Sequence, residues 1–138
     1  METLELQPLA DSIAALKRFI EYYRSKDETS PDIEVETAQT AVIKAFEFTY
    51  EISWKFMRKW IEVNFSANEV DGITRKELFR ISAENRLIDS AEQWFLFNKA
   101  RNMTSHTYNE RTVEYIMELS ETLLTSAENL LERLTERL

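Results

Sequence analysis

Residues 45–55 read AFEFTYEISWK and lie within an apolar run that predicts one long helix from Ile33 or Glu34 to Phe65. Large apolar side chains point in nearly every direction around this helix. A helix that is apolar on most sides is buried on most sides, either at the centre of a bundle or against another subunit. The residues that make this pattern are Phe46, Phe48, Tyr50, Ile52, Trp54, Phe56, Met57, Trp60 and Ile61.

Two carboxylates, Glu47 and Glu51, lie one turn apart within this aromatic segment. Lys44 and Lys55 have the spacing needed to pair with them, so the simpler interpretation is a set of exposed ion pairs on the helix face. The alternative is that both glutamates are polar contacts to a partner or to a motif elsewhere in the chain. Tyr50 fits either a core position or a contact position.

Apolar periodicity predicts helices at both ends of the chain. The first covers about 5–25, and its apolar residues recur three and four positions apart. Pro8 is tolerated only in a first turn, which places the start at or just before Gln7. The last helix is capped by Thr107 or Asn109 and continues to the C-terminus. Its apolar seam consists of Val113, Ile116, Leu123, Ala127, Leu130 and Leu134, with a second row of Met117, Leu124, Leu131 and Leu138.

Capping signals predict two further helices between these. Thr74 and Glu77 have the spacing of a capping box, in which each side chain satisfies an amide at the start of a helix, here Arg75 to about Asn85. Asp89 or Ser90 caps a fourth helix that runs into the segment after residue 100.

The composition agrees with a helical bundle. One glycine and two prolines are too few for the turns of a many-stranded sheet, and 138 residues are enough for one core. We therefore expect a single all-α domain over 1–138, an up-and-down four-helix bundle with an additional short helix. Polar segments at 26–31 and 66–72 are the expected connections.

Several classes of protein are excluded by composition. The chain has no cysteine, so thiol catalysis and Cys-ligated zinc are excluded, and we expect no metal site or cofactor. No apolar run reaches the length of a membrane span and no signal-peptide core is present, which predicts a cytoplasmic protein without membrane contact. The net charge of −8 argues against a broad nucleic-acid-binding surface. The segment 74–108 nevertheless carries a net charge of about +2, which permits a local basic pocket.

The segment Arg101 to Tyr108 contains the only histidine of the chain, His106, between two helical runs. In a continuous helix Arg101 and His106 would lie about 140° apart, so they converge only if the helix breaks between them. The residues of 104–107 favour such a break, since most of them prefer caps and turns. Alternatively, the segments of two subunits could meet in one composite pocket.

An arginine and a histidine in proximity suit metal-independent cleavage of an RNA phosphodiester. Histidine exchanges protons near neutral pH, and a guanidinium binds phosphate through a planar set of donors. His106 would then act as the general base or acid, and Arg101 would stabilise the charge that develops on phosphorus. Asn102 and Ser105 could orient either group. A lone histidine in a helical protein is more often structural or simply exposed.

The Arg-x4-His-x-Tyr pattern at 101–108 resembles the signature of the HEPN superfamily of helical bundles. Together with AFEFTYEISWK at 45–55, the run RNMTSHTYNE at 101–110 is similar to one branch, the nucleotidyltransferase substrate-binding protein family. The similarity covers most of the chain.

This resemblance implies a HEPN-like homodimer that pairs with a minimal nucleotidyltransferase encoded nearby. In related pairs the helical protein is a ribonuclease toxin, and the nucleotidyltransferase is an antitoxin that transfers AMP to a tyrosine. By position, Arg101 and His106 correspond to the ribonuclease pair and Tyr108 to the modified tyrosine. Added charge and bulk beside His106 would then inactivate the site.

Three functions are therefore compatible with the sequence. The first is a binding subunit of a two-component nucleotidyltransferase, with a nucleotide or short RNA as a possible contact. The second is an active metal-independent ribonuclease toxin that uses Arg101 and His106. The third is a helical oligomerisation module without chemistry.

Overall fold

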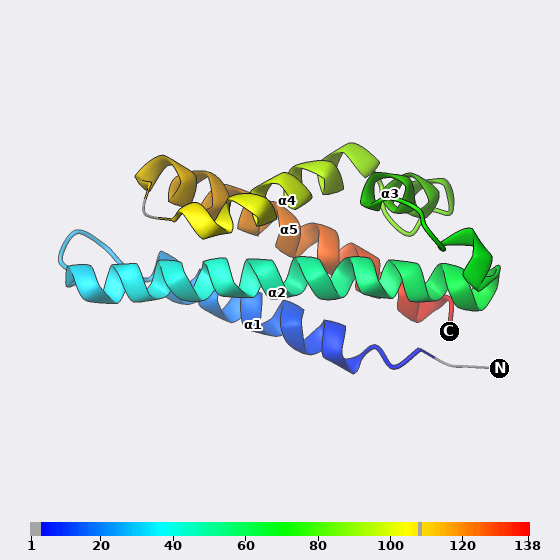
Figure 1. The fold of residues 1–138 in the computed structure, drawn as a ribbon. Coiled ribbons are helices and arrows are strands. Elements are labelled where there is room, and N and C mark those ends of the chain that lie inside the picture. Colours follow the sequence, from blue (N-terminus) through cyan, green and yellow to red (C-terminus); the bar gives the residue numbers. More distant parts are fainter. Residues whose placement is uncertain (1–3, 108) are drawn as a thin grey trace.

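The computed structural model describes residues 4–107 and 109–138, and over this part of the chain it is built from helices and their connections. The predicted all-α architecture is confirmed (Figure 1). In chain order, the elements are α1 (Gln7–Arg24), α2 (Asp32–Asn64), the 3₁₀ turn η1 (Ala67–Glu69), α3 (Arg75–Glu84), α4 (Ala91–Met103), the 3₁₀ turn η2 (Thr104–His106) and α5 (Glu110–Glu136).

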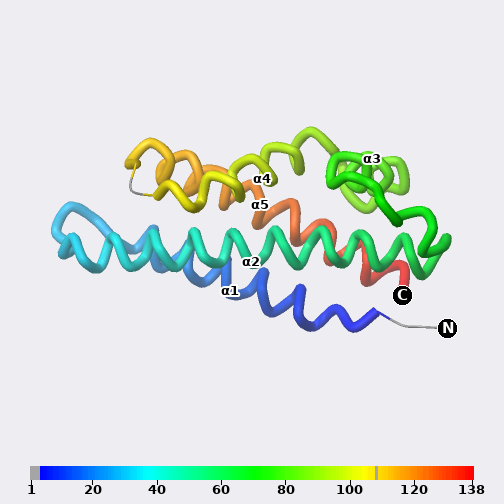
Figure 2. Tube along the Cα trace, in the orientation of Figure 1, coloured from blue at the N-terminus to red at the C-terminus, as the bar shows by residue number. Residues whose placement is uncertain are grey.

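The long helix α2 is the element against which all the other main helices pack. α1 and α5 contact α2 and each other, while α3 and α4 pack together over another part of α2. Figure 2 shows that the N-terminal and C-terminal segments lie at one end of the bundle. The α1–α2 connection and the α4–α5 connection lie at the opposite end, so η2 lies at an end of the molecule, where Ser105 and His106 are exposed and Thr104 is buried.

Side-chain caps define the starts of three helices, as the sequence predicts. Thr74, Ser90 and Asn109 each accept a hydrogen bond from a backbone amide in the following turn, at 2.9 to 3.3 Å. These bonds satisfy amides that have no partner within the helix. Between the alternatives left open by the sequence, the structure selects Ser90 over Asp89 and Asn109 over Thr107.

The core is one cluster to which all five α-helices contribute. The predicted seam of α5 is buried from Ile116 to Leu134, whereas Val113 is only partly buried and Leu138 is 64% exposed. The second apolar row of α5 is partly buried up to Leu131. Leu138 is exposed because it lies beyond the end of α5 at Glu136. Several aromatic rings fill the space between α2, α3 and α4: Phe46, Tyr50, Phe79, Trp94 and Phe97 are all at most 2% exposed.

One face of α2 differs from the expectation that this helix is covered on most sides. Phe48 is 58% exposed and Ile33 is 68% exposed, because α1 and α4 flank this face without covering it. Within 4–107 and 109–138, no helix has both the length and the apolar content that a bilayer span requires.

Candidate functional site

The helix break between Arg101 and His106 is present. α4 ends at Met103 and is followed directly by η2, so Arg101 lies in the last turn of α4 and His106 lies in the 3₁₀ turn. Thr104 stabilises this end of α4, since its hydroxyl donates to the Arg101 carbonyl oxygen at 2.8 Å. The same carbonyl oxygen also accepts the backbone N–H of Thr104, so the buried Thr104 side chain supplies a second donor at this helix end.

The Arg101 guanidinium points from α4 toward α2. Its Nε lies 3.4 Å from Oε1 of Glu51, and its Nη1 lies 3.3 Å from the Thr104 hydroxyl oxygen. The Nε atom is buried, but its N–H is not aligned with Glu51 well enough to form a hydrogen bond. The contact is therefore an ion pair between side chains that are each about one-third exposed, which contributes at most about 1 kcal/mol to stability. Its main effect is on the orientation of the guanidinium.

Glu51 is held at both of its oxygens. The indole Nε1 of Trp54, one turn further along α2, donates to Oε2 at 3.0 Å, while Oε1 faces Arg101. The interpretation of Glu51 as an exposed partner of Lys55 is therefore wrong, since Lys55 lies instead near the Trp54 ring, 5.7 Å from its centroid. Glu47 follows the simpler interpretation and pairs with Lys44 at 3.7 Å.

A partly buried hydrogen-bonded network lies beside this ion pair. The Tyr50 hydroxyl donates to Oδ1 of Asn98 at 2.5 Å and accepts from Nη1 of Arg75 at 3.0 Å. Arg75 also stacks on the Trp54 ring, with Cζ 3.7 Å from the centroid. Asn98 lies one turn before Arg101 on α4, so Arg75 is connected to the Arg101 turn both through Tyr50 and through Trp54 and Glu51.

Burial raises the pKa of Tyr50 to about 12, and the hydrogen bond from Arg75 opposes this rise only in part. The phenol is consequently protonated at neutral pH and acts as a donor to Asn98. Sequence reasoning did not identify Asn98, it included Thr104 only among the residues that favour a helix break, and it placed Arg75 only as the first residue of the third helix. Asn98 and Thr104 each lie one turn from Arg101 in the sequence, but the contact of Asn98 with Tyr50 and Arg75 joins three helices, and no local spacing indicates it.

The remaining predicted residues lie on the solvent side of this end of the bundle. Asn102, Ser105 and His106 are exposed. Tyr108 lies outside the described residues. The structure thus brings together Arg101, Glu51 and Tyr50 with its partners, and it places His106 on the turn that follows.

Two grooves run to this region. The first, here called the α1–α2 groove, has a volume of about 870 Å³, lies along the exposed face of α2 and ends at Glu51 and Arg101. Its lining is mainly apolar and includes Phe19, Ala41, Ala45 and Phe48.

The second groove, here called the acidic groove, has a volume of about 940 Å³ and lies between the α1–α2 connection and the start of α5, beside Thr107. Its carboxylates are Asp27, Glu28, Asp32, Glu36, Glu110 and Glu114. Such a lining repels phosphate groups. Across residues 4–107 and 109–138, no group of three or more acidic, His or Cys side chains is arranged to hold a metal ion.

The chain is thus an all-helical bundle that carries an arginine in the last turn of one helix and a histidine on the 3₁₀ turn that follows. Comparison with known proteins identifies the family. The profile of the family described as "Nucleotidyltransferase substrate binding protein like" matches residues 4–136. The chain therefore belongs to this family, and the family resemblance identified from the sequence is confirmed.

Individual relatives agree with this assignment. A Haemophilus influenzae protein named "Probable ribonuclease HepT" is 27% identical over 111 residues, which cover 80% of this chain and 76% of that protein. A Haemophilus influenzae structure, described as revealing the fold of a substrate binding domain of a nucleotidyltransferase, has a TM-score of 0.85 and 23% identity, covering 95% of this chain and 99% of that one. A crystal structure from Thermus thermophilus has a TM-score of 0.71 and 24% identity, with 91% and 98% covered. At these identities the two structures show the shared fold.

Proposed function

We propose that this chain is the helical partner subunit of a two-component minimal nucleotidyltransferase of the toxin–antitoxin type. The observation that carries the proposal is the family match over residues 4–136. The α1–α2 groove, which is open and ends at an oriented arginine, supports it as a surface for a partner or a nucleotide. Co-expression with a tagged nucleotidyltransferase encoded beside this chain tests it. A complex that survives size-exclusion chromatography is expected, and separate elution of the two proteins would contradict the proposal.

The α1–α2 groove also supports homodimerisation. Its exposed Phe48 lies beside the small side chains of Ala41 and Ala45, and Lys44 lies beside Glu47. A face that carries both a projection and a depression, and both signs of charge, can be complementary to itself about a two-fold axis. Phe48→Glu is expected to convert a dimer into a monomer in analytical ultracentrifugation. Phe65→Glu is the matched control, because Phe65 is 56% exposed but does not line the groove. Equal dissociation by both variants, or none by Phe48→Glu, would contradict this interface.

Tyr108 is proposed as the residue that the partner modifies. Its phenol oxygen would attack the α-phosphorus of ATP, forming a Tyr–O–AMP bond while pyrophosphate leaves and the phenolic proton passes to a base of the nucleotidyltransferase or to water. The supporting feature is the position of Tyr108 two residues after the exposed His106. Intact-mass measurement after incubation with the partner, ATP and Mg²⁺ is expected to show one added AMP group. Tyr108→Phe is expected to abolish the addition.

Cleavage of RNA by Arg101 and His106 is a second candidate function, favoured by the orientation of Arg101 by Glu51 and Thr104. His106 would take the proton of a ribose 2′-hydroxyl or give one to the leaving oxygen, while Arg101 stabilises negative charge on phosphorus. Asn102 and Ser105 would orient the phosphate or the imidazole. The name of the Haemophilus relative is consistent with this activity.

Induction of the chain alone tests this second candidate. Wild-type protein is expected to arrest growth and shorten specific RNAs, whereas His106→Ala and Arg101→Ala are expected to do neither. If wild-type protein leaves growth and RNA intact, the ribonuclease candidate fails. If it also fails to bind a nucleotidyltransferase, an oligomerisation module without chemistry becomes the better description.

A further inference from the structure

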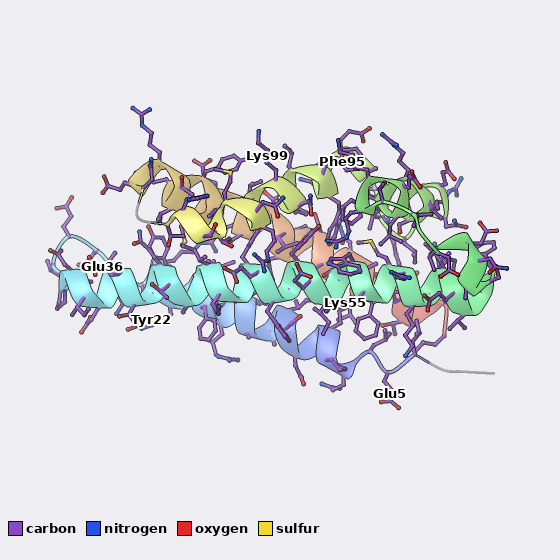
Figure 3. All side chains as sticks on the ribbon, in the orientation of Figure 1. Glu5, Tyr22, Glu36, Lys55, Phe95 and Lys99 are labelled. Carbon is purple, nitrogen blue, oxygen red and sulfur yellow. The ribbon has the colours of Figure 1, made fainter. Side chains whose placement is uncertain are left out.

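A cluster of cations surrounds one aromatic ring on the outer face of α3 and α4. This cluster, here called the α3–α4 strip, consists of Lys76, Arg80, Phe95 and Lys99. Lys76 Nζ and Arg80 Cζ lie 5.7 and 5.6 Å from the centroid of the Phe95 ring. One side of the ring packs on Phe79, with the two centroids 6.1 Å apart, and this contact keeps Phe95 only partly exposed. Figure 3 shows Phe95 and Lys99 pointing in the same direction, away from α2.

The cations of the strip are not neutralised by carboxylates. Among the described residues, none of Lys76, Arg80 and Lys99 has an amine or guanidinium nitrogen within 4.0 Å of a carboxylate oxygen. Most Lys and Arg side chains of the chain likewise form no ion pair among the described residues, so what distinguishes the strip is the gathering of its cations near one ring. Glu84 lies one turn after Arg80 and Glu92 one turn before Phe95, so the positive potential of the strip acts only at short range.

The strip leads to the candidate site. Phe95, Lys99 and Asn102 are spaced four and three residues apart, which places them on one face of α4. Arg101 lies about 100° round the helix from Asn102 and points toward α2, so the strip reaches the candidate segment through Asn102 and through η2, which carries His106 at the end of the helix. Phe95 lies about 10 Å before Asn102 along the helix axis, since each residue advances about 1.5 Å. Beyond η2, Thr107 lines the acidic groove. A polyanion is therefore attracted by the strip and repelled by the groove.

We propose that the α3–α4 strip binds a short stretch of single-stranded RNA and leads it to the Arg101–His106 segment. Lys76, Arg80 and Lys99 contact phosphate groups, and the exposed part of the Phe95 ring contacts a base. The small size of the strip accounts for how an acidic protein can bind RNA locally without a general affinity for nucleic acid. This inference rests on the proposed ribonuclease function and adds the surface that receives the substrate.

Fluorescence anisotropy with a labelled single-stranded RNA oligonucleotide tests the strip. The full chain carrying His106→Ala is used, so that binding is measured without cleavage. In this background, the triple variant Lys76→Gln, Arg80→Gln, Lys99→Gln is compared with Lys17→Gln, Arg18→Gln, Lys59→Gln. The control removes the same charge from exposed cations on α1 and α2, and Arg18 also lies over a phenylalanine ring.

The strip variant is expected to bind the RNA at least about tenfold more weakly than the control variant. A plot of log affinity against log salt concentration is expected to be shallower by about 2 for the strip variant than for the parent. Three phosphate contacts are lost, and each contributes about 0.7 to the slope on a single strand. Phe95→Leu retains the charges and is expected to weaken binding about fivefold or more through loss of base stacking. Equal affinities of the strip and control variants, or no binding of RNA by the parent protein at low salt, would overturn the proposal.

Co-purification with the nucleotidyltransferase distinguishes this inference from the proposed partner function. If the strip variant loses RNA binding but still forms the complex, the strip is an RNA surface. If it loses the complex and binds RNA as the control does, the strip is a protein interface and the RNA proposal is wrong. If the parent binds RNA through the strip but never cleaves it, the strip is supported and the ribonuclease function fails separately.

Discussion

The two sides of α2 are held together by different kinds of interaction. On the side of α1 and α5 the contacts are mainly aliphatic, with residues such as Leu16, Leu123 and Leu130 fully buried, and the buried hydroxyls there bond to backbone carbonyls. On the side of α3 and α4, Tyr50, Arg75 and Asn98 form a network between side chains of three helices. Apolar burial is strong but non-directional, whereas hydrogen bonds fix angles. Apolar burial therefore stabilises both sides, and only on the second side does a network between side chains also position the turn that carries Arg101.

The largest expected loss of stability comes from a substitution in the aliphatic packing between α5, α1 and α2. Leu123→Ala should lower the free energy of unfolding by about 2–5 kcal/mol, because it removes buried methyl groups and leaves a cavity between α5 and its neighbours. Leu96→Ala, at a position 45% exposed on α4, should cost less than about 1 kcal/mol. Urea denaturation monitored by circular dichroism measures both values, and similar losses would contradict the burial of Leu123 in the aliphatic part of the core.

The dependence of stability on alkaline pH tests the α3–α4 side, because raising the pH ionises Tyr50 without a substitution. The phenol of Tyr50 has a pKa of about 12 when folded, against 10.0 normally, so its contribution is complete below about pH 10 and is lost as pH rises through about 12. Two pKa units correspond to roughly 2–3 kcal/mol. Unfolding free energies measured between pH 8 and about 12 should fall more steeply for wild type than for Tyr50→Phe. Parallel curves for the two proteins would show that Tyr50 titrates normally.

Removal of the cation in the network should have a smaller effect. Arg75→Leu loses the stack on Trp54 and a donor to the Tyr50 hydroxyl, so we expect a loss of about 1–2 kcal/mol in unfolding free energy. Arg80→Leu, which removes an exposed guanidinium 5.6 Å from a ring centroid, should cost only a few tenths of a kcal/mol. Thermal denaturation of the two variants compares these losses. A larger loss of stability for Arg80→Leu than for Arg75→Leu would contradict a stabilising role of Arg75 in the network.

The smallest effect on stability is expected for the two glutamates of α2, and there the difference should be functional. Glu51→Gln and Glu47→Gln should each change the unfolding free energy by no more than about 1 kcal/mol, since both ion pairs are partly exposed. Only Glu51→Gln removes the ion pair of the Arg101 guanidinium and leaves it with Thr104 alone, and under the ribonuclease function this should lower the rate of RNA cleavage roughly tenfold. Because Glu51 holds Arg101 rather than His106, the pH dependence of the remaining activity should keep its shape. Equal rates for the two variants would show that Glu51 does not position Arg101.

The helices were predictable because their signals are local. Ser90 and Asn109 lie within one turn of the amides they cap, and the α5 seam repeats at helical spacing. The break after Met103 was predictable for the same reason, since Thr104 acts on a carbonyl three residues before it. Local spacing also identified Arg101 and His106 as a candidate pair.

The contacts of the candidate site were less predictable. Lys55 has the spacing to pair with Glu51, yet Glu51 pairs with Arg101, which is 50 positions away in the chain. Tyr50, Arg75 and Asn98 come from three helices, and their contact depends on how α3 and α4 pack on α2. The exposure of Phe48 likewise depends on which faces the neighbouring helices leave open.

The sequence alone therefore determined the helical class, the order and approximate bounds of the helices and the family resemblance, and it indicated a candidate segment for chemistry. These features follow from interactions within a few residues, which spacing and residue type describe. Only the tertiary structure decided which carboxylate holds Arg101, which residues surround Tyr50, which cations gather around Phe95, and where the acidic groove lies. Those contacts join residues that are distant in the chain, and their geometry exists only after the helices have packed.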